Sequence, residues 1–255
     1  GCTHYSIPEF EDREIMFPGK IIHKESYKVT PLFADLQGFI KDLPYNYNRM
    51  GKTIYKGRNE LKEIEYGGVC MVIKSFRIPN LINRIAYGLF RPSKAKRSYD
   101  YANLILEKGI GTPLPVGYYT CRRWFLFSES YYACLKSECP NTYKDLINGK
   151  FPGTEKIVRA IASLTAHIHK NNMLHKDYSR GNILFKDTPS GVKLEIIDLN
   201  RIRFHKIGME EGCRNFERLP GTDQMTRWMA QEYASKMGYN PDECFKIMNS
   251  CKEKV

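Results

Sequence analysis

The sequence predicts an α+β fold with segregated elements in two lobes: a small antiparallel-sheet lobe with one helix, then a mainly helical lobe. Short strand patterns separated by tight turns occupy residues 53–74. Helical patterns recur later, at 155–171, 222–237 and 242–252. A polar, proline-containing stretch, 136–143, separates these parts. We therefore predict two domains, 1–138 with an N-terminal extension and the small lobe, and 139–255 as the helical lobe.

The small lobe is predicted as an irregular extension, a strand meander, a helix and two further strands. Residues 1–50 mix aromatic and charged residues without clear periodicity, so we expect a strand or two there. The turns Gly57-Arg-Asn59 and Gly67-Gly68 separate three strands. A loop with a short helix is expected at 75–91. The remaining elements are a helix at 93–108, ended by Gly109, and strands at 116–120 and 124–135.

The helical lobe contains the most informative stretch, His175-Lys-Asp-Tyr-Ser-Arg-Gly-Asn182, followed by an apolar strand that ends in Asp198. This pattern is typical of kinase-like phosphotransferases. Asp177 is the candidate catalytic base, and His175 is expected to brace the loop. Asn182 and Asp198 offer the oxygen ligands that magnesium prefers. The alternative is a helix C-cap histidine, a capping aspartate and two unrelated polar residues.

A hairpin is expected to bring the two candidate metal ligands together. The apolar run 182–185 and the return strand 192–197 flank the turn cluster 187–191. Because the second strand runs back along the first, Asp198 should lie beside Asn182.

The small lobe carries the candidate nucleotide-binding residues. Lys74 ends a Val-Ile-Lys strand, the position of the lysine that pairs with ATP phosphates in kinases; the alternative is a strand-ending lysine that points to water. The turn of Gly57, Arg58 and Asn59 can cradle phosphate through its backbone N–H groups, or it is an ordinary hairpin turn. Asp100, in the middle of the predicted helix, is the candidate ion-pair partner of Lys74.

Composition narrows the function classes. The net charge is +12 and 42% of residues are hydrophobic, so we expect a globular protein that is attracted to polyanions, or one with a merely basic surface. Eight dispersed cysteines without a C-x-x-C pair favour reduced cytosolic thiols over disulfides or a metal site. No apolar run reaches the ~18 residues that a membrane-spanning helix needs, and no signal peptide is recognised. No nucleic-acid-binding signature is present, so no nucleic acid is expected.

The chain resembles the bacterial lipopolysaccharide core kinases, which phosphorylate heptose or Kdo sugars. The resemblance extends from about Tyr55 to Phe216. It depends on Lys56-Gly-Arg-Asn59, Val72-Ile-Lys-Ser-Phe76, Ser93-Lys-Ala-Lys-Arg-Ser98, Gly109-Ile-Gly-Thr-Pro113, and the stretches 175–182 and 198–201. It implies a two-lobed protein-kinase-like fold, ATP and Mg²⁺ as cofactors, and a sugar hydroxyl as phosphate acceptor. It also implies Lys74 as phosphate-binding lysine, Asp177 as base, and Asn182 and Asp198 as metal ligands.

Several departures separate the chain from protein kinases. Protein kinases carry Asp-Phe-Gly at the metal-binding aspartate, whereas this chain has Asp198-Leu-Asn200 and so lacks the glycine. No Ala-Pro-Glu motif follows, and position 179 is Ser, where Ser/Thr protein kinases usually carry Lys. The missing glycine removes an easy backbone flip. These differences argue against a protein substrate. Protein kinases also pair the strand lysine with a glutamate on the small-lobe helix, and the lack of an obvious one here leaves catalytic competence open.

The predicted function is ATP- and Mg-dependent phosphorylation of a lipopolysaccharide-core sugar, heptose or Kdo, at the inner membrane face. Arg180 and Arg201 are candidate ligands of the anionic substrate, or they serve only solubility. The expected location is cytoplasmic, with peripheral contact to an anionic membrane surface. Two alternatives remain: another small-molecule kinase, such as an aminoglycoside-like one, and a pseudokinase that acts as a binding module.

Overall fold

The computed structural model divides the chain into two compact units. The described residues are 13–16, 22–76, 92–123 and 126–254. Unit 1 comprises 1–100 and 114–136, and unit 2 comprises 101–113 and 137–255. Helix α4 (Lys94–Glu107) therefore contributes its first half to unit 1 and its second half to unit 2. In the described part of the chain, no helix is long and apolar enough to cross a membrane.

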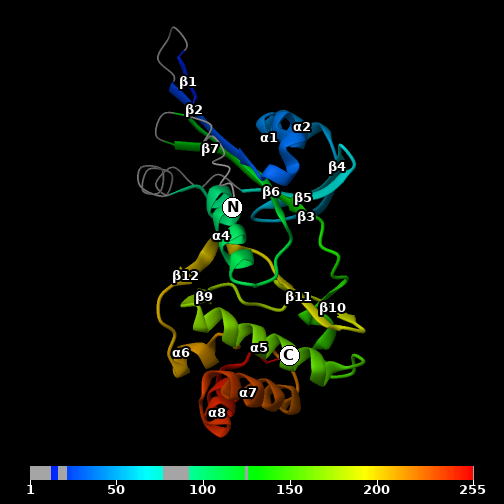
Figure 1. Cartoon of the computed structure of the whole chain (residues 1–255), viewed down its shortest axis with the longest axis vertical. Helices are drawn as coiled ribbons and strands as arrows, with labels where there is room; N and C mark the ends of the chain where they lie inside the picture. The colour runs from blue at the N-terminus through cyan, green and yellow to red at the C-terminus, as the bar shows by residue number, and fades with distance from the viewer. Residues whose placement is uncertain (1–12, 17–21, 77–91, 124–125, 255) are drawn as a thin grey trace, which may run out of the picture. The chain divides into compact units, whose positions relative to one another are not determined.

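Unit 1 is built on an antiparallel sheet that, within the described residues, has seven strands in the order β1-β2-β6-β7-β5-β4-β3 (Figure 1). The strands are β1 Arg13–Met16, β2 Ile22–Val29, β3 Lys52–Lys56, β4 Glu60–Tyr66, β5 Val69–Ser75, β6 Pro115–Arg123 and β7 Leu126–Leu135. The predicted meander is confirmed, and so are the later helix and two strands. The loop predicted at 75–91 falls almost wholly outside the described residues.

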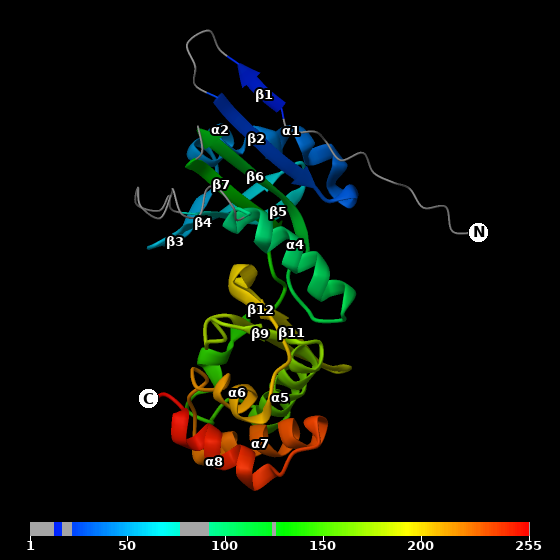
Figure 2. The same cartoon turned by 90° about the vertical axis from the view of Figure 1, so that its left-hand side faces the viewer.

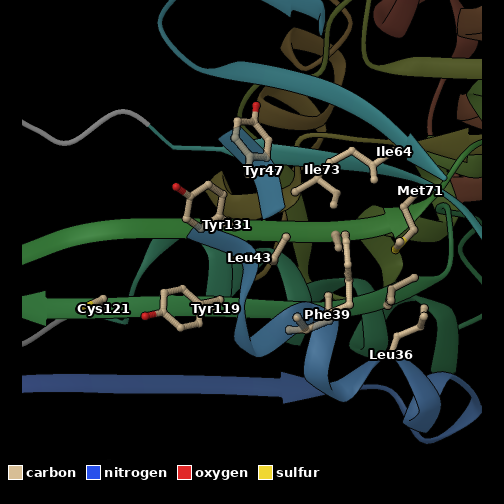
Figure 3. Close-up of a cluster of buried hydrophobic side chains, with 13 residues drawn as sticks. Leu36, Phe39, Leu43, Tyr47, Ile64, Met71, Ile73, Tyr119, Cys121 and Tyr131 are labelled. Carbon is tan, nitrogen blue, oxygen red and sulfur yellow. The ribbon is translucent and has the colours of Figure 1, made fainter. Parts of the chain in front are cut away.

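Short helices that the sequence did not predict cover one face of this sheet. They are η1 (Pro31–Leu36), α1 (Gln37–Lys41) and α2 (Leu43–Arg49). Their buried side chains Phe39 and Leu43 pack against sheet residues that include Met71, Ile73 and Tyr131 (Figure 3). The expectation of an irregular segment at 1–50 with a strand or two was therefore incomplete.

Helix α4 covers the opposite face. Ala95 and Tyr99 of α4 form a second apolar cluster with Phe76 and Tyr118. Side chains alternate between the two faces along a strand. Phe76 lies two residues after Lys74, so the alternation places Lys74 on the same face as α4.

Unit 2 contains helices and two small sheets (Figure 2). Its elements are β8 Asn141–Thr142, η2 Tyr143–Leu146, α5 Thr154–Lys170, β9 Met173–His175, β10 Ile183–Thr188, β11 Gly191–Ile196, η3 Leu199–Arg201, β12 Ile202–Phe204, α6 Met209–Arg214, α7 Asp223–Met237 and α8 Pro241–Cys251. Helix α7 packs between α5 and α8. The predicted helices at 155–171, 222–237 and 242–252 and the hairpin are confirmed, so the α+β fold class holds.

A tight backbone contact joins the segment after α4 to the hairpin. Ile196 N donates to Gly111 O (2.9 Å), and Thr112 Oγ1 donates to Ile196 O (2.7 Å). A Cβ at position 111 would lie only 2.1 Å from the carbonyl oxygen of Leu194. Glycine at this position therefore allows the chain to pass against β11, which leads to Asp198.

Candidate active site

The candidate catalytic loop, residues 175–182, begins at the end of strand β9, which pairs antiparallel with β12 so that His175 lies opposite Ile202. His175 is buried. Its Nδ1 accepts from Asp177 N (3.1 Å) and its Nε2 donates to Ile197 O (2.9 Å). Burial lowers the pKa of His175, which keeps the ring neutral. The side chain thus connects the loop to the residue before Asp198, the geometry expected of a brace.

Asn182 and Asp198 lie at the same end of the β10–β11 hairpin. Ile183 pairs with Ile196, and Ile197 N donates to Asn182 O (3.0 Å). The side-chain amide of Asn182 donates through Nδ2 to Asp177 O (2.8 Å). The Asn182 side chain therefore helps to position Asp177, the candidate base. The amide oxygen of Asn182 takes no part in this bond and can bind a further partner.

Asp198 adopts a left-handed backbone conformation, with φ 63° and ψ 55°. Such a conformation is uncommon outside glycine, although Asp tolerates it better than most residues. Asn200 Nδ2 donates to Asp198 Oδ1 (3.0 Å), and Leu199 is buried. The segment then enters β12 directly at Ile202, so the backbone around Asp198 is held on both sides.

The residues present fit a magnesium ion. Among the described residues there is no group of three or more His, Cys, Asp or Glu side chains that would form a metal site made of protein alone. Magnesium usually keeps several waters and is held by one or two side-chain oxygens together with substrate phosphates. The amide oxygen of Asn182 and the carboxylate of Asp198 are such ligands.

Two arginines, Arg201 and Arg218, lie close to the carboxylate of Asp177. Arg201 Nη1 donates to both carboxylate oxygens, at 2.9 and 3.2 Å. Arg218 Nη1 lies 3.7 Å from the same carboxylate. Arg180 instead donates to Glu253 (3.1 Å). Sequence reasoning selected Arg180 and Arg201 but missed Arg218 and Glu253, which belong to no recognisable motif.

A chain of largely buried hydrogen bonds supports the candidate catalytic loop from behind, and no sequence pattern predicts it. Tyr233 Oη donates to His169 Nδ1 (2.8 Å), and His169 Nε2 donates to Asn215 Oδ1 (3.0 Å). Asn215 Nδ2 then donates to His175 O (3.0 Å). Burial lowers the pKa of His169 to about 4. Helices α5 and α7 are thereby connected to the backbone of the histidine that braces the loop.

Unit 1 carries the candidate nucleotide residues. Lys74 Nζ lies 5.1 Å from the centre of the Phe76 ring, and on α4 Asp100 forms an ion pair with Lys96 (2.7 Å). Because Phe76 packs against α4 and side chains alternate along the strand, Lys74 lies on the face of the sheet that α4 covers, and α4 carries Asp100.

The candidate phosphate turn joins β3 to β4 at one edge of that sheet. Gly57 N donates to Asn59 O (3.0 Å), and Arg58 is exposed. The functional roles of the turn, Lys74 and Asp100 stay predictions.

The two-part α+β fold and the catalytic loop with its amide and carboxylate place the chain among the kinases of protein-kinase-like fold. Residues 143–237 match the model of the lipopolysaccharide kinase (Kdo/WaaP) family. This match supports the family resemblance found in the sequence, over a segment that contains His175, Asp177, Asn182 and Asp198. The matched range does not include the part of the predicted resemblance that precedes residue 143.

A solved structure supports the fold over a larger part of the chain. The structure described as "WaaP in complex with acyl carrier protein" aligns with a TM-score of 0.61 at 15% sequence identity. The alignment covers 88% of this chain and 94% of that one. No curated protein sequence matches the chain significantly.

Proposed function

We propose that this kinase transfers the γ-phosphoryl group of ATP to a sugar hydroxyl of lipopolysaccharide core, heptose or Kdo. The observation that carries the proposal is the hydrogen-bonded unit of Asp177, Asn182 and His175, which lies beside Asp198 at one end of the hairpin. A binding module has no need of a general base held in this way. The family match supports the sugar class of the acceptor.

The proposed chemistry assigns one role to each residue of unit 2. Asp177 orients the acceptor hydroxyl and takes its proton. Asn182 and Asp198 would hold magnesium, which would supply positive charge to the ATP phosphates. His175 takes no proton from the acceptor; its hydrogen bonds hold the backbone of Asp177 and of the residue before Asp198 in place. Positioning and electrostatics carry most of the rate, because phosphoryl transfer needs little covalent participation by side chains.

The proposed nucleotide contacts come from unit 1. Lys74 pairs with the α- and β-phosphates, and the backbone of Gly57, Arg58 and Asn59 covers the phosphates. Asp100 is proposed to orient Lys74. Because Asp100 already forms an ion pair with Lys96, this last role requires one carboxylate to serve two lysines.

The proposed location is the cytoplasmic face of the inner membrane, with peripheral contact to anionic lipid. The net charge of +12 supports this location, since each lysine or arginine near an anionic surface contributes ~1 kcal/mol to membrane binding.

We also propose an acyl carrier protein as a partner, because the similar WaaP structure was solved in complex with one. Isothermal titration with purified acyl carrier protein tests the partner, and an absence of heat at micromolar concentrations removes it.

The nucleotide site is tested by the thermal stability of the purified protein with and without Mg-ATP. Ligand at ~100 times its dissociation constant adds ~2.7 kcal/mol to stability, enough to raise the unfolding midpoint visibly. We expect a magnesium-dependent rise in the wild type that Asp198→Asn abolishes. Asp242→Asn, in the first turn of α8, is the matched control and should keep the rise.

Turnover then separates catalysis from binding. Asp177→Asn should retain the Mg-ATP stabilisation but lose phosphorylation of heptose- or Kdo-containing core by orders of magnitude. A wild type that Mg-ATP does not stabilise would favour the pseudokinase instead. Stabilisation combined with phosphorylation of a cationic aminoglycoside, but not of core sugars, would favour the other small-molecule kinase.

A further inference from the structure

Three arginines and two carboxylates form one connected cluster at the catalytic loop. Arg201 binds the carboxylate of Asp177, and Arg180 binds that of Glu253. Arg218 spans both, with Nη1 3.7 Å from Asp177 Oδ1 and Nε 3.7 Å from Glu253 Oε1. The guanidinium group of Arg218 therefore links Glu253 to Asp177, the candidate catalytic base.

Glu253 is held in this place by its backbone. Glu253 N donates to Glu217 O (2.7 Å), directly beside Arg218 in the chain. The preceding residue, Lys252, forms an ion pair with Asp223 (2.7 Å) and its side chain is only 18% exposed. The side chain of Glu253 is 41% exposed, so it can rotate away while the backbone stays fixed.

The charges of the cluster favour an incoming anion. Three guanidinium groups carry +3 and the two carboxylates −2, which leaves +1. If the Glu253 side chain rotates into water, the remaining groups carry +3 against −1. A guanidinium group forms two parallel hydrogen bonds with carboxylate or phosphate, so the contacts that Glu253 makes are available to either group.

We propose that Arg180 and Arg218 form the binding site for an anionic group of the acceptor, a phosphate or a carboxylate, and that Glu253 competes with the acceptor for this site. The proposal rests on the proposed function, because it places the anionic group one guanidinium away from the base that receives the hydroxyl proton. Arg218 thus selects acceptors with a negative charge near the reacting hydroxyl. Glu253 keeps the two arginines paired until such an acceptor arrives.

The first test measures the binding of inorganic phosphate to the full chain at constant ionic strength, from the rise in thermal midpoint. Glu253→Gln removes the competitor and should lower the apparent dissociation constant by up to about fivefold, the upper end of the range for an exposed ion pair. Arg218→Gln should raise it about tenfold, because it removes a charge-assisted contact. Arg180→Gln is a second variant with the same expected direction.

An exposed ion pair elsewhere in unit 2 provides matched controls. Arg214 and Glu210 form an i,i+4 pair at 2.7 Å, so Arg214→Gln and Glu210→Gln remove the same charges. Both should leave the phosphate dissociation constant unchanged. The proposal is overturned if Glu253→Gln does not tighten binding, or if Arg218→Gln and Arg214→Gln weaken it equally.

Repeating the titration with free Kdo, a sugar carboxylate, separates the two anions, since the variants should alter the dissociation constant of the group that the site accepts. Mg-ATP stabilisation is measured on the same variants. If the kinase proposal is wrong, Mg-ATP will not stabilise the wild type. If only the anion site is wrong, Mg-ATP will still stabilise the wild type, but Glu253→Gln will leave the phosphate dissociation constant unchanged.

Discussion

Acid should destabilise unit 2 through the buried His169. Its pKa of about 4 in the folded chain lies below the ordinary 6.5 because burial desolvates the ring, an effect larger than the opposing hydrogen bond to Asn215. Between these values the unfolded chain binds a proton that the folded chain does not, so stability falls as the pH drops. From pH 7 to pH 5 the expected loss is about 2 kcal/mol from this group alone. The lowered pKa of His175 acts in the same direction.

Urea unfolding at pH 7 and pH 5, followed by the fluorescence of Trp228 in α7, measures this loss. Trp124→Phe is introduced into every protein so that only Trp228 reports, since the chain has two tryptophans. His169→Gln is less stable at pH 7, but it lacks the titrating ring and should lose about 2 kcal/mol less on acidification. Equal losses in the two proteins would refute the assignment of the effect to His169.

Two further predictions concern the supports of the site. Gly111→Ala should lower the free energy of unfolding by about 2–3 kcal/mol, because its Cβ would lie 2.1 Å from the oxygen of Leu194. Gly208→Ala, with no atom within 4 Å of the new Cβ, should change urea unfolding far less. Asn215→Ala should reduce kcat while the dissociation constant of Mg-ATP stays unchanged, because the carbonyl of His175 loses its donor. An unchanged kcat would show that Asn215 does not position the loop.

Much of the fold could be predicted because its elements carry strong local signals. The meander of β3, β4 and β5 combines short strand patterns with glycine turns, and α5 shows a clear helical period over 17 residues. Helices α1 and α2 have only five and seven residues, too short for such a period. They are stabilised by burial of Phe39 and Leu43 against a sheet whose strands lie far away in the sequence.

The candidate site was predictable only where a motif records it. His175, Asp177, Asn182 and Asp198 follow a fixed spacing that reflects one compact loop and one hairpin. Arg218, which follows α6, lies near Asp177, and Glu253, which follows α8, lies near Arg218; these contacts depend on how the two helices pack. No periodicity or spacing in the sequence encodes such a contact between distant segments, so the contact could not be predicted from the sequence.

The left-handed backbone at Asp198 has a consequence for inhibitor design. The packing of the Asp-Phe-Gly segment sets the active or inactive state of a protein kinase, and a compound that binds only an inactive state, with the aspartate turned outward, would trap that state. Here Asn200 and Leu199 hold that aspartate, and pairing of Ile202 with His175 follows at once. Without a glycine to ease the rotation, we expect no stable outward state for such compounds to trap. Selective ligands for this enzyme should therefore be sought against Arg180 and Arg218, the proposed acceptor site.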